Sequence, residues 1–276
     1  MQIVFFNHYH NGDIFASKGY VADLIKEFKG HDIFYQHLHS PKLLKDLNIE
    51  YRSLEFPMGP FNDRTPFAGD SDSIYINTWI GNYLKYGNGI NWDTYHLMFK
   101  KIYSVLEDTV DKSIELGPVS YYFPEINYDY FDIPNLTIPK NSVIISNGPV
   151  LSGQSNLANL NDIISNILEN TDKHIILTHF APFNSDRISF TNNLIDTTGG
   201  DLNEIAWIAE HCEYIIGRNS GPFCFMTNKN ILNNKNKTIV SIGNNEKDSF
   251  LYNVPVNASY HFLNDSEIDN ILEIVR

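Results

Sequence analysis

Long apolar runs are missing from this sequence. No stretch approaches the roughly 18 apolar residues that a membrane-spanning helix needs, so we expect no transmembrane segment. The first residues also lack the basic and apolar regions of a secretory leader, which favours a cytoplasmic protein. Cysteine is scarce: Cys212 and Cys224 are too few for a disulfide framework and have no metal-ligand spacing.

The sequence also contains few positively charged residues. The chain has 20 Lys and Arg residues against 33 Asp and Glu residues, a formal net charge of −13. Such a surface excludes general nucleic-acid binding, although a small nucleotide needs only a few cations and backbone N–H groups. No Gly-x-Gly-x-x-Gly motif follows a predicted strand, which argues against a nicotinamide-dependent enzyme.

The opening stretch predicts a strand, a polar loop and a helix. Residues 3–6 are wholly apolar, as in a strand buried on both faces, and Asn11-Gly12-Asp13 has turn chemistry. Apolar residues then recur at helical spacing over 14–28, and Asp13 is expected to cap that helix. Ligands of such α/β units lie beyond the carboxyl ends of the strands, so residues 7–13 are expected to line a site.

The same alternation continues to the end of the chain and predicts an α/β protein with two Rossmann-like parallel-sheet domains. The proline-containing, aromatic segment 121–140 is the expected boundary, which gives domains 1–135 and 136–276. Further strands are expected at 33–35, 49–54, 73–79, 142–149 with its turn, 174–179, 213–217 and 237–242. Helices are expected at 41–47, 92–114, 159–168, 202–211, 223–228 and 267–275, and loops at 56–73 and 81–89.

A small-residue turn follows the predicted strand 213–217. Backbone N–H groups in Arg218-Asn219-Ser220-Gly221-Pro222 can approach an anion, and Arg218 and Ser220 add donors. The pattern fits a phosphate or a nucleoside diphosphate, and the alternative is an ordinary turn. Two other loops at strand ends are candidate walls of the same site. One contains Asn147-Gly148. The other carries Arg187, one of the few cations of the chain, whose alternative role is that of an ordinary charged residue exposed to solvent.

Candidate residues in the first half suggest two different chemistries. Asp13 is the best general base, because a carboxylate at a strand-to-helix loop can reach a proton in a cleft, and its alternative role is the helix cap. His8 and His10, with His179 from another strand end, form a weaker metal-hydrolase pattern. Trp79 and the nearby aromatic and Asn residues suit stacking on sugar rings, and their alternative role is core packing.

Two motifs of the sequence resemble those of the bacterial heptosyltransferase-like group of compact GT-B type glycosyltransferases, and more distantly fucosyltransferases. His10-Asn-Gly-Asp13 before the first helix looks like the family's Gly-Asp motif, whose Asp is the proposed base. The segment 214–222 looks like the family's strand and Ser-Gly turn beside the donor diphosphate. Asn219 stands where the family usually has Asp, and 223–225 replace its His-rich helix start.

The resemblance implies a sugar transfer from a nucleotide-sugar to a hydroxyl of a glycan or lipid-linked acceptor. Asp13 would take the acceptor proton without a metal ion, and no Asp-x-Asp motif suited to one is evident. Lipid-linked acceptors would bring the protein to the inner membrane face. The alternatives are the metal-dependent hydrolase and a non-catalytic nucleotide- or carbohydrate-binding protein. The implied donor-binding residues are Asn147, Gly148, Arg187, Arg218, Asn219, Ser220, Gly221 and Pro222, and the implied acceptor-binding residues are His10, Asn11, Thr78, Trp79 and Asn82.

Overall fold

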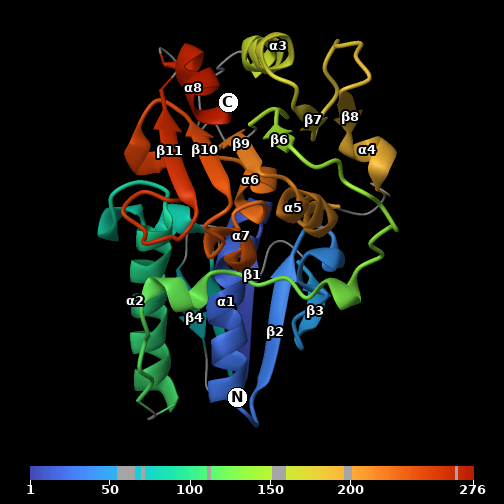
Figure 1. Ribbon diagram of the computed structural model, residues 1–276. Coiled ribbons are helices and arrows are strands. Elements are labelled where there is room, and N and C mark those ends of the chain that lie inside the picture. The colour runs from blue at the N-terminus through green and yellow to red at the C-terminus, as the bar shows by residue number, and fades with distance from the viewer. Residues whose placement is uncertain (55–65, 70–71, 111–112, 151–159, 196–200, 265–266) are drawn as a thin grey trace. The chain divides into compact units, whose positions relative to one another are not determined.

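The computed structural model describes residues 1–54, 66–69, 72–110, 113–150, 160–195, 201–264 and 267–276. The chain divides into two compact units, Met1–Glu125 and Ile126–Arg276, each with its own sheet (Figure 1). The division falls inside the segment 121–140, in which a boundary is expected. Within the described ranges, no helix combines the length and the hydrophobicity of a membrane span.

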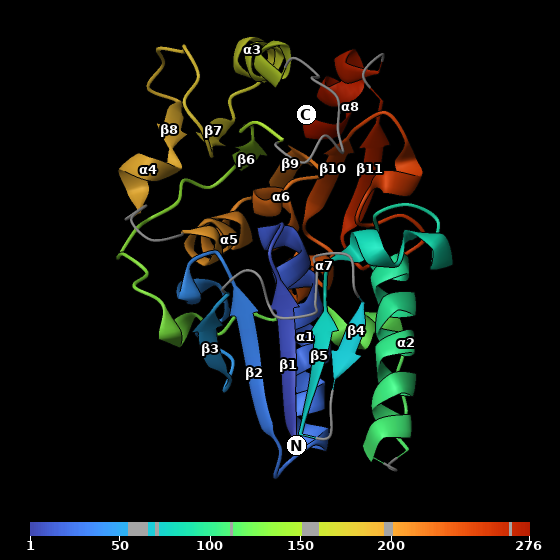
Figure 2. The ribbon, with the colours of Figure 1, turned by 180° about the vertical axis from the view of Figure 1, so that it is seen from behind.

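Unit one contains a sheet of five described strands in the order β3-β2-β1-β5-β4, visible in Figure 2. Strands β3, β2, β1 and β5 are parallel, and β4 pairs antiparallel with β5 at the edge. Residues 3–7 of the central strand are all buried, as expected for a strand covered on both faces. The strands are β1 (Gln2–Asn7), β2 (Asp32–His37), β3 (Glu50–Ser53), β4 (Phe67–Gly69) and β5 (Ser73–Asn77).

Two long helices accompany this sheet, and α1 covers one of its faces in Figures 1 and 2. The apolar positions of α1 that recur at helical spacing, such as Ile14, Val21 and Leu24, are fully buried. The long helices are α1 (Asn11–Glu27) and α2 (Trp92–Val110), and the 3-10 turns are η1 (Pro41–Leu44), η2 (Ile80–Asn82), η3 (Leu84–Tyr86) and η4 (Val119–Tyr122).

Unit two contains a sheet of six described strands in the order β11-β10-β9-β6-β7-β8, and every pairing is parallel. All five residues of β6 and all five of β9 are buried. The apolar runs that predicted these strands therefore form the centre of the sheet. The strands are β6 (Ser142–Ser146), β7 (His174–Leu177), β8 (Ile188–Phe190), β9 (Tyr214–Arg218), β10 (Thr238–Ile242) and β11 (Ser259–Leu263).

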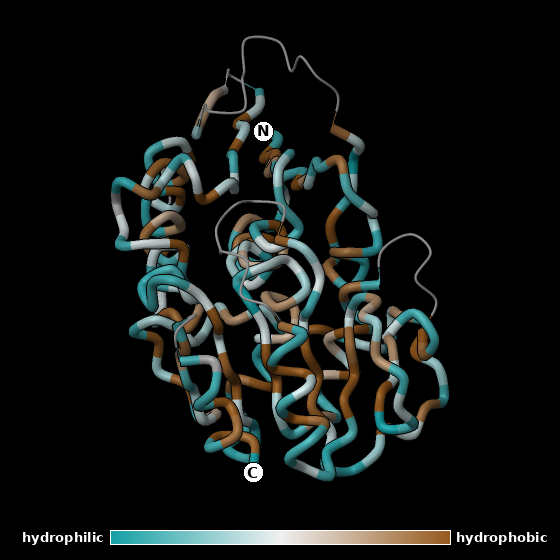
Figure 3. Tube along the Cα trace, turned by 90° about the horizontal axis from the view of Figure 1, so that it is seen from above, coloured by the Kyte–Doolittle hydropathy of each residue, from teal (hydrophilic) through white to brown (hydrophobic). Residues whose placement is uncertain are grey.

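The core of unit two joins its strands to α3, α8 and neighbouring loops. Ile163 and Ile167 of α3 and Ile271 of α8 pack with the apolar side chains of β6, β7, β9 and β10. Figure 3 shows the corresponding alternation of hydrophobic and hydrophilic stretches along the chain. The helices are α3 (Leu160–Asn170), α4 (Thr191–Leu194), α5 (Leu202–His211), α6 (Gly221–Phe225), α7 (Lys229–Leu232) and α8 (Ile271–Val275), with 3-10 turns η5 (Tyr128–Tyr130), η6 (Glu246–Asp248) and η7 (Ile268–Asn270).

Several local predictions were wrong. Strands β4, β8 and β11 were not predicted, because as edge strands they are mostly half-exposed and lack a continuous apolar run. The second long helix does not extend to Ile114, whose N–H donates to the Glu107 carboxylate at 2.6 Å instead. Residues 56–65, 70 and 71, from the segment 56–73 that was expected to be a loop, lie outside the described residues.

Candidate functional site

Asp13 lies in the first turn of α1, just beyond the carboxyl end of β1. It is not the helix cap: His10 is the N-cap residue, and no side chain caps α1. The Asp13 carboxylate instead bonds to two other elements through Oδ1. Ile80 of η2 donates its N–H at 3.0 Å, and the Tyr95 hydroxyl of α2 donates at 2.9 Å. Asp13 is therefore held by residues far away in the sequence.

Burial sets the protonation behaviour of this carboxyl group. Asp13 is only 3% exposed, and burial raises its pKa from 3.8 to about 6. The hydrogen bonds from Ile80 and Tyr95, and one from its own backbone, lower the pKa and offset part of the effect. A carboxylate with a pKa close to neutrality can both accept and release a proton at physiological pH.

Partly exposed polar and aromatic side chains surround Asp13 in unit one. The rings of Tyr9 and Trp79 lie 4.3 Å apart between centroids, and Gly81 leaves room for the Trp79 ring, because a Cβ there would lie 2.2 Å from it. Two buried side-chain atoms, Oδ1 of Asn11 and Nδ2 of Asn82, have no hydrogen-bond partner. The structure thus brings the predicted residues Asn11, Trp79 and Asn82 to one edge of the sheet, near Asp13.

Thr78 does not share this exposed position. It is fully buried, and its hydroxyl lies 2.7 Å from the Tyr35 hydroxyl and 3.3 Å from the Phe6 carbonyl oxygen. The side chain therefore joins β1, β2 and the end of β5 inside the core. A direct contact between Thr78 and an acceptor, as the sequence suggested, is not supported by this placement.

The predicted histidine ligands do not form a metal-binding group within one unit. His8 and His10 follow β1 in unit one, and His179 follows β7 in unit two. Burial lowers the pKa of His10, and the nearby His39 lowers it further. Among the described residues, no three His, Cys, Asp or Glu side chains could hold a metal ion together. Of the Asp-x-Asp sequence at 70–72, only Asp72 belongs to the described residues, and it directly precedes β5, at the opposite edge of the sheet from Asp13.

In unit two, the predicted small-residue turn connects β9 to α6. The Ser220 side chain caps α6 by accepting the Phe223 N–H at 3.3 Å, and its hydroxyl lies 3.3 Å from that of Ser146 at the end of β6. Gly217 allows this close packing, because a Cβ there would lie 2.5 Å from the Phe223 ring. Gly221 and Pro222 form the first turn of α6. The turn therefore lies at the carboxyl edge of the sheet, where an α/β domain binds its ligand.

Two further predicted residues join this edge. Arg218 is 5% exposed and donates from Nη2 to the Gly148 carbonyl oxygen at 3.0 Å. The Asn147 side chain makes a reciprocal pair of 2.8 Å bonds with the backbone of His179, after β7. These contacts fix the loops after β6, β7 and β9 against one another.

Arg187 lies elsewhere. It directly precedes β8, and its guanidinium donates to the carbonyl oxygens of Leu168 and Thr171. Since the strands are parallel, this position is at the amino edge of the sheet, opposite Ser220. The structure therefore separates Arg187 from the other predicted donor-binding residues.

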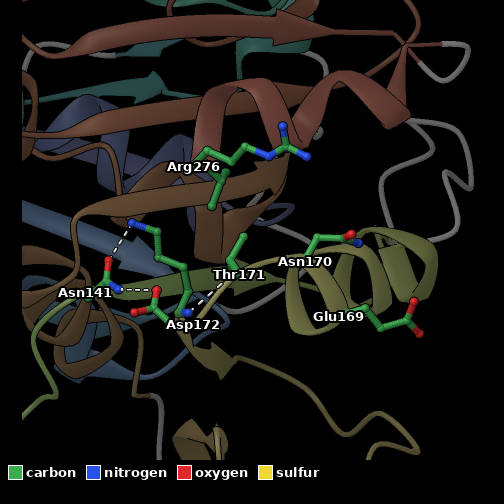
Figure 4. A pocket seen from close by; sticks show the side chains of 8 residues that line it. Asn141, Glu169, Asn170, Thr171, Asp172 and Arg276 are labelled. Carbon is green, nitrogen blue, oxygen red and sulfur yellow. Dashed lines mark hydrogen bonds between the residues drawn. The ribbon is translucent and has the colours of Figure 1, made fainter.

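The same amino edge carries a large open hollow of about 680 Å³ (Figure 4). Its polar groups bond to one another: Asn141 Nδ2 donates to Asp172 at 2.9 Å, and Lys173 Nζ donates to Asn141 Oδ1 at 2.5 Å. Asn141 adopts φ 65°, which Asn tolerates better than most residues. These bonds join the chain segments that lead into β6 and β7.

A smaller cavity of about 80 Å³ lies at the carboxyl edge of β9 and β10. Asn219, from the small-residue turn, forms part of its wall together with residues after β10. No prediction from the sequence covered the lining residues after β10, and none identified the contact between Asp13 and Tyr95. The aromatic and Asn-rich composition was the signal for unit one, whereas no local motif marks the loop after β10.

Neither protein-family models nor curated proteins give a match to this chain. Solved structures do match over nearly its whole length. E. coli heptosyltransferase WaaC with ADP-2-deoxy-2-fluoro heptose matches with a TM-score of 0.56 and 8% identity, over 99% of this chain and 98% of WaaC. E. coli ADP-heptose lps heptosyltransferase II matches with a TM-score of 0.51 and 10% identity, over 100% of this chain and 98% of that one. These likenesses confirm the predicted fold class: the chain has the α/β fold of heptosyltransferase structures, with two Rossmann-like parallel-sheet domains of GT-B type.

Proposed function

We propose that this chain is a glycosyltransferase that moves a sugar from a nucleotide-sugar to a hydroxyl group of a glycan or lipid-linked acceptor. The observation that carries the proposal is the buried Asp13 carboxyl, whose pKa is raised to about 6 at the carboxyl edge of a sheet in a heptosyltransferase-like fold. If Asp13 had only a structural role, we would expect a cation beside it, because a cation offsets the free-energy cost of burying a carboxylate. Asp13 is bonded through Oδ1 only to neutral donors, Ile80 N–H and the Tyr95 hydroxyl.

The proposed reaction is one displacement. The acceptor oxygen forms a bond to the anomeric carbon, the bond from that carbon to the donor phosphate oxygen breaks, and the acceptor proton passes to Asp13. Because Oδ1 is held by Ile80 and Tyr95, Oδ2 is the oxygen that receives the proton. Trp79 and Tyr9 supply aromatic faces for the acceptor sugar, and His10, Asn11 and Asn82 supply polar contacts.

Unit two is proposed to hold the donor diphosphate. The turn after β9 offers backbone N–H groups and the Ser220 hydroxyl, and Arg218 adds positive charge beside Gly148. Fixed donors of this kind stabilise negative charge that develops on a leaving diphosphate, without requiring a metal ion. The domain roles are thus acceptor binding by unit one and donor binding by unit two. Arg187 has no part in this scheme, because it lies at the opposite edge of the sheet.

The first test is thermal stabilisation by UDP, GDP, ADP, CMP and NAD, each with and without EDTA. A ligand that binds only the native state raises the melting temperature, and at one hundred times its Kd it stabilises by about 2.7 kcal/mol. We expect a clear shift with one nucleoside diphosphate that EDTA does not change. Absence of any shift, together with destabilisation by EDTA, would overturn the proposal in favour of the metal-dependent alternative.

The second test separates catalysis from binding. Asp13→Asn is expected to lower the transfer rate by about 10²- to 10⁴-fold, the usual contribution of a general base, while nucleotide binding persists. Asp32→Asn is the matched control, since Asp32 is exposed at the start of β2. Equal transfer rates in wild type and Asp13→Asn would remove Asp13 from the catalytic role. A protein that binds a nucleotide-sugar but transfers no sugar would instead be a binding protein.

A further inference from the structure

A network of hydrogen-bonded side chains lies in the core of unit one, close to Asp13. Its members are Asn7 at the end of β1, Ser17 of α1, Tyr35 of β2 and Thr78 after β5, and all four are 0% exposed. Burial raises the pKa of Tyr35, and although its two bonds within the network lower it, the charge of Asp13 raises it again. Polar groups this deep are costly unless they bond to one another.

Thr78 is the centre of this network. Its hydroxyl lies 2.7 Å from the Tyr35 hydroxyl and accepts from Asn7 Nδ2 at 3.3 Å. The Tyr35 hydroxyl in turn lies 2.8 Å from the Ser17 hydroxyl, which donates to the Ile14 carbonyl oxygen at 2.7 Å. One chain of contacts therefore joins the end of β5 to β1, β2 and α1, which lie side by side in unit one (Figure 2).

The Asn7 side chain extends the network to the turn after β1. Its Nδ2 bonds to Thr78, and its Oδ1 accepts the N–H groups of Tyr9 at 2.9 Å and His10 at 3.3 Å. Both ends of one buried amide are thus in use. If Thr78 had no hydroxyl, Nδ2 would lose this acceptor, and a rotation of the amide toward another would release the two N–H groups from Oδ1.

The segments that the network joins are those that carry the proposed acceptor site. The turn 8–10 contributes an aromatic ring and an imidazole, and Ser17 lies four residues after Asp13, on the same face of α1. Thr78 directly precedes Trp79. A shift at any of these links would move the aromatic and polar side chains relative to the Asp13 carboxylate.

A core of apolar side chains with the same shapes would be about as stable, since a buried hydrogen bond only replaces bonds to water. Connected polar networks instead favour one arrangement of the segments they join. We propose that Thr78 is a positioning residue: its hydroxyl, through the Asn7 amide, holds the turn after β1 in one geometry relative to Asp13. The link to catalysis rests on the proposed function, whereas the position of the turn does not.

Four variants test this role. Thr78→Val removes the hydroxyl with little change in shape, and Thr78→Ser keeps the hydroxyl and should restore the wild-type behaviour. Tyr35→Phe removes the hydroxyl that bonds to Thr78, and it replaces Thr78→Val if that protein folds poorly. Thr94→Val is the matched control, because Thr94 of α2 is also 0% exposed and its hydroxyl has no hydrogen-bond partner in the described part of the chain.

The first measurement needs no substrate. Amide hydrogen exchange by mass spectrometry should be about tenfold faster over 8–11 in Thr78→Val and Tyr35→Phe, because the loss of a buried hydrogen bond favours local opening. Exchange in α2 should stay unchanged, and Thr78→Ser and Thr94→Val should match wild type. If Thr78→Val accelerates exchange equally in α2 and over 8–11, or in neither, the hydroxyl does not fix the turn and the proposal is overturned.

The second measurement follows the proposed reaction with water in place of the acceptor. The probes are ADP-glucose, GDP-mannose and UDP-glucose, and the release of nucleoside diphosphate is measured. The water oxygen bonds to the anomeric carbon, the bond from that carbon to the phosphate oxygen breaks, and a water proton passes to Asp13. A reacting group that is misplaced by about 1 Å can lower the rate about 10²-fold.

We expect Thr78→Val and Tyr35→Phe to lower kcat about ten- to a hundredfold and to leave KM for the nucleotide-sugar within about twofold, because the donor is assigned to unit two. Thr78→Ser and Thr94→Val should stay within about twofold of wild type in both constants. An unchanged kcat in Thr78→Val, or a change in KM alone, would overturn the proposal. If wild type releases no diphosphate from any probe and no nucleotide raises its melting temperature, the proposed function fails, and exchange over 8–11 then decides whether Thr78 fixes the turn.

Discussion

Asp13 combines nearly complete burial with two hydrogen bonds from neutral donors. Lys18, one turn further along α1, shows the contrasting arrangement, because its Nζ lies 2.5 Å from the Asp46 carboxylate, and both side chains are buried. Lys18 and Asp46 neutralise each other, whereas Asp13 has no such counter-charge among the contacts of its carboxylate. Its burial therefore costs stability whenever the group is ionised.

The first prediction concerns that cost. The pKa of Asp13 is raised from 3.8 to about 6, so the neutral form stabilises the fold fully below pH 3.8, and this contribution is lost as pH rises through 6. Because the pKa is raised by about two units, the free energy of unfolding above pH 7 is lower by roughly 3 kcal/mol than it would be if Asp13 were still neutral. Asp13→Asn should therefore raise the melting temperature at pH 8 and have little effect at pH 4. Denaturation at both pH values checks this, and equal effects would contradict the raised pKa.

The second prediction concerns Tyr95. Its hydroxyl stabilises the ionised form of Asp13, so Tyr95→Phe should raise the pKa of Asp13 further, by about one unit. The transfer rate of wild type should increase with pH through about 6, and the variant should need a higher pH for the same increase. Tyr103→Phe is the matched control, because the Tyr103 hydroxyl donates to Asp23 at 2.8 Å from the same helix. If both variants shift the pH dependence of the transfer rate, or if neither does, Tyr95 does not position Asp13 for catalysis.

At the scale of elements, α1 depends on one close approach. A Cβ at Gly19 would lie 2.0 Å from the Tyr122 carbonyl oxygen, so only glycine lets η4 lie against this face of α1. Tyr122 also stacks on Tyr20 of α1, with ring centroids 4.3 Å apart and an interplanar angle of 11°. This contact attaches the end of unit one to the helix that carries Asp13.

The third prediction is that Gly19→Ala destabilises the protein by about 1–3 kcal/mol, the usual cost of overpacking. Gly117→Ala is the control, because the nearest atom to a Cβ there lies at 3.6 Å and the change should stay within about 0.5 kcal/mol. Urea denaturation of both variants measures the difference. If Gly19→Ala and Gly117→Ala unfold at the same midpoint urea concentration, α1 and η4 can move apart more easily than their packing indicates.

For the whole molecule, the two units are expected to respond to different ligands. The fourth prediction is that a bound nucleoside diphosphate slows amide hydrogen exchange in the loops after β6 and β9, around Gly148 and Ser220, because ligand contacts oppose local opening. Residues around Arg187 should exchange at an unchanged rate, since they lie at the opposite edge of the same sheet. Exchange measured by mass spectrometry with and without the nucleotide tests this. Protection confined to the amino edge would contradict the proposed donor site.

Local patterns predicted the elements well where burial is uniform. The apolar runs of β1, β6 and β9 are fully buried strands, and the spacing of apolar residues in α1 matches its buried face. Predictions failed for the edge strands β4, β8 and β11, which are mostly half-exposed and carry mixed residues, whereas the edge strand β3 was predicted at 49–54. An edge strand is defined by the neighbour it pairs with, which its own sequence does not specify.

The sequence by itself determined the α/β class, the position of Asp13 beyond a buried strand and the small-residue turn after β9, because short-range periodicity and turn chemistry govern these features. Tertiary structure alone decided the environment of each candidate. Tyr95, 82 residues away, bonds to Asp13, Thr78 is enclosed in the core, and Arg187 lies at the amino edge. Burial and hydrogen bonding between distant segments depend on how the whole chain packs, and these two quantities set the pKa and the accessibility of a side chain.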